Sequence, residues 1–119
     1  MKTVKITTEN KISIIDVDFD DYRSIQNAIG GGLIETVKTQ KMWDYFKQPI
    51  MFICDEEGHP KHLPINRLGS WLYDTEKHGW PIAGDIIFAV PEGPEILGLE
   101  NAAQTYVKLL DDFDYLEEE

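Results

Sequence analysis

The chain reads PIMFICDEEG over residues 49–58. Residues 50–54 form an almost unbroken apolar run, with a proline before it and turn-forming residues after it. Short apolar runs bounded in this way are typical of strands that are buried on both faces of a sheet. We therefore predict a central β-strand over residues 50–54, with a turn over residues 55–58.

Four more segments carry the apolar pattern of strands and end at turn residues; they cover residues 2–8, 11–19, 33–37 and 85–90. Glu9 and Asn10, which separate the first two segments, have the chemistry of a tight turn, so these segments are expected to form a hairpin. With the central strand, the pattern predicts a mostly antiparallel sheet of about five strands.

Two shorter helices are predicted around this sheet. Asp20 or Asp21 can accept a hydrogen bond at a helix start, and the glycines at 30–32 can end that helix in a left-handed conformation. A second short helix is expected to begin at residues 63–64, since proline suits the first helical turn. Its apolar side comprises Leu68, Trp71 and Leu72.

The strongest helical pattern begins at Leu99. Its apolar stripe comprises Ala102, Ala103, Tyr106, Val107, Leu110 and Phe113. We expect this helix to pack on the sheet, and we expect the acidic segment 111–119 to fray. Residues 74–81 and 91–94 are predicted to be loops, and residues 39–48 fit either a helical turn or an exposed loop.

These elements predict an α+β fold in a single domain over residues 1–119. The formal net charge is −11, so the surface repels phosphate backbones and direct nucleic-acid binding is disfavoured. The acidity favours either a soluble surface or a surface that mimics nucleic acid toward a basic partner. We expect a cytoplasmic protein with no membrane contact, because no apolar run nears the ~20 residues of a membrane span and no signal peptide is evident.

Asp16, Asp18 and Asp20 alternate along the chain, so their carboxylates would share one face if the strand continued through them. Such a row could hold a divalent cation. The spacing is not that of an EF-hand loop, because Asp21 occupies the position of the invariant glycine and Asn27 that of the bidentate glutamate. The alternative is a solvated strand edge that leads into a helix cap.

His59 and His62 stand beside the acidic residues 55–57, and imidazoles with carboxylates can bind zinc. Pro60 disfavours a regular helix there, so the sequence does not place the two rings on one face. Cys54 could pair with one of the histidines as a nucleophile, or it could be a small buried apolar residue at the end of its strand.

The segment 63–67, LPINR, places two polar residues in an apolar setting. Arg67 could clamp an anion, or it could cap a helix or form an internal salt bridge. Trp80 in the following loop could belong either to an exposed binding patch or to the core. The candidate ligand-binding residues are Asn66, Arg67, His78, Trp80, Asp55 and Glu57.

The order of four short motifs resembles the domain-of-unknown-function family 3846, which occurs in bacterial, plasmid and phage genomes. The motifs are GGLIE (31–35), DEEG (55–58), LPINR (63–67) and IAGD (82–85). The similarity spans about residues 10–115, with longer insertions near residues 42–46 and 73–81 than the family pattern has. The resemblance implies an α+β domain of bacterial or phage origin, and it brings no activity and no catalytic residue.

For function, we predict a non-enzymatic binding or interaction module that needs no cofactor and whose partner is a protein or a small molecule. Two alternatives stay open at this point. One is an acidic, nucleic-acid-mimicking inhibitor of a nuclease or DNA-binding protein. The other is a small metal-dependent hydrolase that uses His59 and His62.

Overall fold

The computed structural model describes residues 1–118 of the chain. Within these residues, six strands form one sheet: β1 (Lys2–Ile6), β2 (Ile12–Asp16), β3 (Ile34–Val37), β4 (Met51–Asp55), β5 (Ile86–Glu92) and β6 (Glu95–Leu97). Five of them follow the order β2-β1-β5-β4-β3, and β6 pairs with the end of β5. Every pairing is antiparallel, so the predicted sheet type is confirmed.

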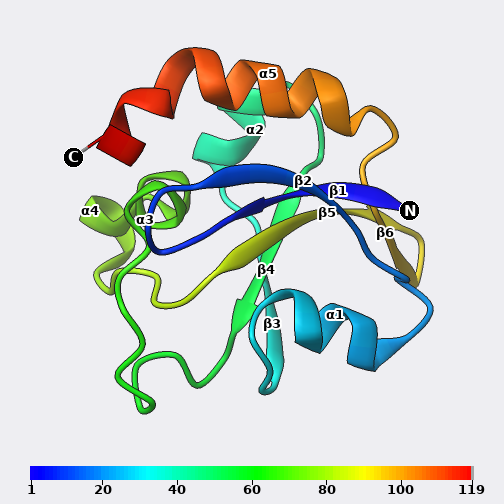
Figure 1. Ribbon diagram of the computed structural model, residues 1–119, viewed down its shortest axis with the longest axis horizontal. Helices are drawn as coiled ribbons and strands as arrows, with labels where there is room; N and C mark the ends of the chain where they lie inside the picture. The colour runs from blue at the N-terminus through cyan, green and yellow to red at the C-terminus, as the bar shows by residue number, and fades with distance from the viewer. Residues whose placement is uncertain (119) are drawn as a thin grey trace.

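The described residues also form five α-helices: α1 (Tyr22–Ala28), α2 (Gln40–Phe46), α3 (Arg67–Tyr73), α4 (Thr75–His78) and α5 (Ala102–Phe113). Figure 1 shows α1 on one face of the sheet and α5, with α2 beneath it, on the other. The long C-terminal helix α5 contacts β1 and β2. The predicted α+β fold with a C-terminal helix packed on the sheet is therefore confirmed.

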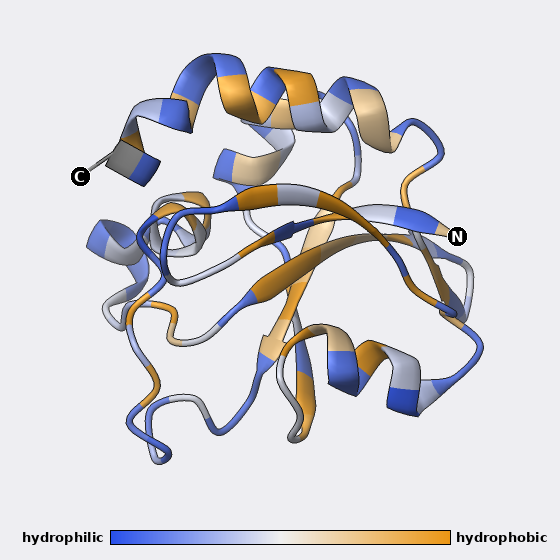
Figure 2. Ribbon diagram, in the orientation of Figure 1, coloured by the Kyte–Doolittle hydropathy of each residue, from blue (hydrophilic) through white to orange (hydrophobic). Residues whose placement is uncertain are grey.

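The core lies on both faces of the two central strands, which appear among the most hydrophobic parts of the ribbon in Figure 2. Phe52 and Phe88 belong to the cluster shared with α2, α3 and α5, whereas Ile53 and Ile87 belong to the cluster covered by α1. All five residues of β4 are buried. The central strand predicted from the apolar run is thus confirmed, with its bounds one residue later.

One ambiguous stretch proves to be helical, and two short elements lie where loops were predicted. The ambiguous stretch at 39–48 contains α2, whose first turn is capped by Thr39: its Oγ1 accepts a hydrogen bond from the amide of Met42 at 3.2 Å. Part of the predicted loop 74–81 is the single-turn helix α4. At the predicted loop 91–94, Gly93 with a φ of 59° turns the chain back, so that β6 pairs with β5.

Helix α3 begins at Arg67, not at residues 63–64 as predicted. Residues 63–66 are not helical, and Ile65 forms an isolated bridge with Ala83. This pairing uses the backbone of the segment before the helix, so Asn66 becomes the cap. Trp71, predicted on the apolar side of this helix, is 39% exposed and packs edge-on against Tyr45, with 5.6 Å between the ring centroids.

The buried stripe of α5 is rotated from the predicted one. Ala102, Thr105 and Leu109 are buried, while the predicted core residues Ala103 and Val107 are exposed. The apolar residues of α5 extend over a wider arc than the part of the helix that the sheet covers, so the sequence alone does not fix which of them are buried. Here the packing of Leu109 against the sheet residues decides it.

The acidic C-terminal segment, which we expected to fray, is helical as far as it is described. Residues 111–113 complete α5, and the 3-10 helix η1 (Asp114–Glu118) follows. Leu116 is buried in the core, and its carbonyl accepts a hydrogen bond from Asn10 at 3.2 Å. Glu119 lies outside the described residues. That the chain forms a single domain stays a prediction.

No helix in residues 1–118 combines the length and apolar character that crossing a membrane requires.

Candidate functional site

The most exposed large apolar side chain among the described residues is Trp80, at 73%. Its ring meets the ring of His59 edge-on, with 5.6 Å between the centroids. His78, at the end of α4, lies against Tyr73 at 5.1 Å in the same stretch of chain. We name His59, Tyr73, His78 and Trp80 the Trp80 surface; it joins two predicted candidates from residues 78–80 with the turn that holds His59.

The segment that presents Trp80 is anchored on both sides. Before it, the Thr75 hydroxyl donates to the carbonyl of Ser70 at 3.1 Å. After it, the amide of Ile82 donates to the Ser70 hydroxyl at 2.9 Å, and a ring nitrogen of His59 makes a short polar contact with the carbonyl of Pro81. The exposed indole is therefore carried by a loop with fixed ends.

Asn66 is buried in the interior, where it cannot contact a ligand at the surface. It is 0% exposed, and its Oδ1 accepts a hydrogen bond from the amide of Gly69 at 2.8 Å, which caps α3. Its Nδ2 donates to the carbonyls of Ile6 and Gly84, at 3.1 and 3.0 Å. The side chain joins β1, the segment before β5 and the start of α3, so it serves the fold.

Asp55 is also buried. One carboxylate oxygen pairs with Lys61 Nζ at 2.7 Å, and the other accepts a hydrogen bond from the amide of Glu57 at 2.8 Å. The third glycine of the triple, Gly32, lies directly over this pair. The predicted set thus separates into two buried residues, Asn66 and Asp55, and an exposed remainder that comprises Arg67, His78, Trp80 and Glu57.

The predicted metal ligands His59 and His62 both lie on the surface. His59 faces the carbonyl of Pro81 and the ring of Trp80, and His62 adopts a left-handed conformation with a φ of 57°. Among the side chains that the structure describes, which end at residue 117, no three His, Cys, Asp or Glu are grouped so that they could hold a metal ion.

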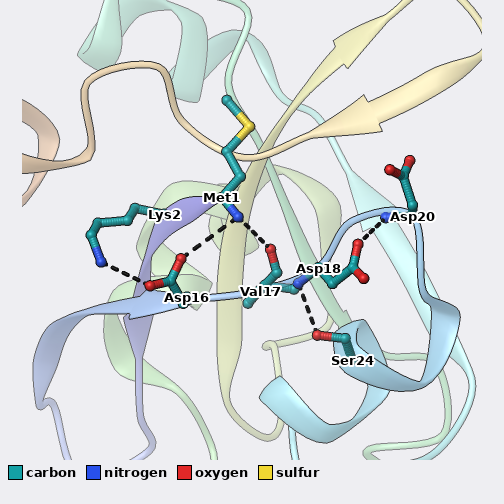
Figure 3. Close-up of polar contacts among 7 residues, drawn as sticks. All are labelled: Met1, Lys2, Asp16, Val17, Asp18, Asp20 and Ser24. Atoms are coloured by element: carbon teal, nitrogen blue, oxygen red, sulfur yellow. Dashed lines mark hydrogen bonds and ion pairs between the residues drawn. The ribbon is translucent and has the colours of Figure 1, made fainter.

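The carboxylates of Asp16 and Asp18 make different contacts (Figure 3). Asp16 pairs with Lys2 Nζ at 2.8 Å, and this hydrogen bond, with the charge of Lys2, lowers the pKa of Asp16. Asp18 accepts a hydrogen bond from the amide of Asp20 at 3.0 Å, and its own amide donates to the Ser24 hydroxyl at 2.9 Å. The strand ends at Asp16, so the carboxylates do not continue along one strand face.

Cys54 is buried in the core, in agreement with the second of the two roles considered for it. Burial raises the pKa of its thiol to about 12, with smaller contributions from the charges of Glu35 and Asp55. A thiolate is the reactive form of cysteine, and this environment opposes it. The thiol is not placed to act as a nucleophile.

We expect native Cys54 to react with a disulfide reagent at pH 8 at least about 100-fold more slowly than the same thiol in urea. In the folded protein the reagent cannot reach the buried sulfur, and the raised pKa keeps the thiol protonated. The measurement is the absorbance of the released thiol with and without denaturant. Equal rates in the two conditions, with the native fold checked by circular dichroism, would contradict the buried placement.

Four surface clefts are lined by none of the residues of the Trp80 surface, nor by Asn66, Asp55, His62 or Cys54. Three of them follow one another from α2 to the start of α5, because the first and second share Gln48 and Pro49, and the second and third share Leu99 and Asn101. Sequence reasoning missed them, since their walls come from segments far apart in the chain: the first two strands, α2 with the segment before β4, the β5–β6 hairpin and the start of α5. The one available signal was the dense turn chemistry of residues 91–98.

Comparison with known proteins places the chain in a family. The family model described as Domain of unknown function (DUF3846) matches residues 1–111 of the 119. No curated protein and no solved structure matches the chain. The resemblance seen in the order of the four motifs is confirmed over nearly the whole sequence, and the chain belongs to the DUF3846 family.

Proposed function

We propose that this chain is a non-enzymatic binding module that contacts a partner protein through the Trp80 surface. The observation that carries the proposal is the exposure of the Trp80 indole on an anchored loop. Keeping such a large apolar ring in water is unfavourable, because its apolar surface is not removed from solvent. Tryptophan is also enriched among the residues that dominate the energy of protein interfaces.

The anchoring of the loop favours tight binding, because an anchored loop is ordered before a partner binds, whereas a flexible loop is not. The bonds of Ser70 to Ile82 and to Thr75 hold the two ends of the segment before any partner arrives. A side chain that is already positioned loses less conformational entropy on association. The edge-on contact with His59 restricts the indole ring further.

The chemistry of the described residues supports binding over catalysis. The thiol of Cys54 is buried and protonated, and His59 is engaged by the carbonyl of Pro81. A catalytic nucleophile needs an adjacent base within hydrogen-bond reach and access to substrate. The acidic mimic and the metal-dependent hydrolase stay predictions, and neither gains a specific observation.

The test is retention of partners by variants of the purified chain. We expect Trp80→Ala to lose a protein that the wild-type chain retains from a lysate of the organism that encodes it, because a central tryptophan often contributes about 2 kcal/mol or more. Once that partner is purified, its dissociation constant should rise about 30-fold or more for Trp80→Ala.

Trp43→Ala is the matched control, since Trp43 is also exposed, at 48%, but lies on α2. It should retain the partner with an unchanged dissociation constant. Circular dichroism would establish that both variants are folded. If every retained protein binds Trp80→Ala as tightly as wild type, the Trp80 surface is not the contact surface.

A further inference from the structure

The second of the three clefts around α5 has a volume of about 450 Å³. That volume falls within the range of sites for small molecules. Its apolar walls include Pro49, Val90 and Leu97, from the segment before β4, from β5 and from β6. We name this space the hairpin cleft, because the β5–β6 hairpin forms one side of it.

The charge on the walls of the hairpin cleft has one sign. Glu92 and Glu100 both line it, and no Lys, Arg or His is among its lining residues. Met1 also lines it, but the Met1 ammonium donates to the carbonyl of Val17 at 2.9 Å and lies 3.6 Å from Asp16, as Figure 3 shows. The cleft therefore offers two carboxylates without a neutralising side-chain base on its walls.

A third polar group in the hairpin cleft is Thr105, on the buried side of α5. The residue is 7% exposed, and it lines the cleft. Its backbone amide donates to the carbonyl of Asn101 at 3.4 Å, whereas its hydroxyl has no hydrogen-bond partner among the described residues. The Thr105 oxygen is not among the side-chain atoms that are both shut off from solvent and unpartnered, so it is open to the space of the cleft, where it can accept a hydrogen bond from a ligand.

The floor of the cleft is fixed by a close backbone approach. The amide of Leu99 donates to the carbonyl of Lys2 at 3.0 Å, and Gly98 lies so close that a Cβ there would stand 2.7 Å from the same carbonyl oxygen. Only glycine lets the chain pass at this distance. The walls are thus held in place by β1, which makes the cleft preformed.

From these observations we propose that the hairpin cleft binds a small organic cation, namely a primary amine or a guanidine carried on a short apolar chain. The apolar chain would lie against Val90 and Leu97, and the cationic head would lie near Glu92 and Glu100. The N–H groups of the head can donate to both carboxylates and to the Thr105 hydroxyl, an acceptor that an anionic or aliphatic ligand would leave unused.

The experiment uses the full chain labelled with ¹⁵N and four probes of equal chain length: hexylammonium, hexylguanidinium, hexanoate and hexanol. We expect the two cations to shift the amide signals of Val90, Leu97 and Glu100 in a saturable way, while hexanoate and hexanol leave them unchanged. The cleft is wrongly assigned if hexanoate or hexanol binds there as well as the cations do. The assignment also fails if the cations shift signals over the whole acidic surface without saturation.

Variants test whether the carboxylates of Glu92 and Glu100 bind the cationic head of the ligand. The double variant Glu92→Gln with Glu100→Gln should raise the dissociation constant of hexylammonium about fivefold, the loss that about 1 kcal/mol of partly exposed ion pairing corresponds to. The control is Glu95→Gln, because Glu95 stands opposite Glu92 in the β5–β6 ladder but lines a different cleft. It should leave that constant unchanged, and an equal loss in both variants would overturn the proposal.

A last measurement tests whether the cleft binds a small molecule or a lysine side chain of another protein. A capped pentapeptide with a central lysine between leucines carries the same ammonium on a peptide backbone. We expect it to bind more weakly than hexylammonium, because the cleft is the size of a small molecule. Tighter binding of the peptide would contradict the small-molecule assignment.

Discussion

Replacing Asn66 with alanine is expected to lower the free energy of unfolding by about 3–5 kcal/mol. The side chain makes three hydrogen bonds in the interior, to the amide of Gly69 and to the carbonyls of Ile6 and Gly84. Each such bond contributes about 1 kcal/mol, and loss of a helix cap costs about 1 kcal/mol. Interior carbonyls that lose their donor add a desolvation cost. Urea unfolding followed by circular dichroism measures the loss.

Asn101→Ala is the matched control for Asn66→Ala. Asn101 also caps a helix, since its Oδ1 accepts a hydrogen bond from the amide of Gln104 at 3.2 Å, but it is exposed and joins no distant segments. This variant should lose only about 1 kcal/mol. If the two variants lose equal stability, Asn66 acts as a simple cap and does not link three elements. If Asn66→Ala does not fold, Asn66→Ser, which keeps a neutral oxygen as the cap acceptor, should retain part of the stability.

The second large effect is expected at Gly32, where alanine should cost about 3–5 kcal/mol. Gly32 has a φ of +91°, a conformation that side chains with a Cβ occupy at a cost of about 1–3 kcal/mol. A Cβ would also stand 2.7 Å from Oδ2 of buried Asp55, and closer still to Lys61 Nζ. The new methyl group would thus separate or displace an ion pair whose carboxylate cannot reach water, a change that is strongly destabilising.

Gly31→Ala separates the two contributions. Gly31 has a similar φ of +99°, but a Cβ there would have no heavy atom within 4 Å. This variant should pay only for the backbone conformation, about 1–3 kcal/mol. Urea unfolding of both variants gives the difference. A Gly32→Ala variant that is no less stable than Gly31→Ala would show that the Asp55–Lys61 pair moves aside without cost.

The parts of the fold that were predictable from sequence are those with local signals. The apolar run of β4 and the alternation in β1 and β2 identified strands, because side-chain periodicity directly reflects burial. Helix α4 and strand β6 were missed, since four and three residues carry too little periodicity to stand out from loops. The orientation of α5 was missed for another reason: Val107 and Leu109 are equally apolar, and only the surface beneath the helix distinguishes them.

Among the candidate site residues, too, sequence gave no indication of properties that depend on contacts with distant segments. For Trp80, both an exposed and a buried position were considered, and the neighbouring sequence does not decide between the two positions. Its exposure follows from the path of the loop that Ser70 anchors. Asn66 was considered a ligand contact because it is polar in an apolar segment. Its real partners, Ile6 and Gly84, are 60 and 18 residues away, so a local pattern could not indicate them. The hairpin cleft was missed because its walls come from distant segments.

The central place of β5 has a consequence for synthesis of the chain. The β1–β2 hairpin and the β3–β4 pair, whose strands are separated in the chain by α2, both come early in the sequence, yet the two pairs meet only through β5. Ile87 of β5 stands opposite Lys5 of β1 and opposite Ile53 of β4. Contacts across such a long stretch form slowly, because a large loop must close first. A growing polypeptide therefore leaves the ribosome as two unfinished half-sheets with open inner edges, and the strand that joins them is among the last to emerge.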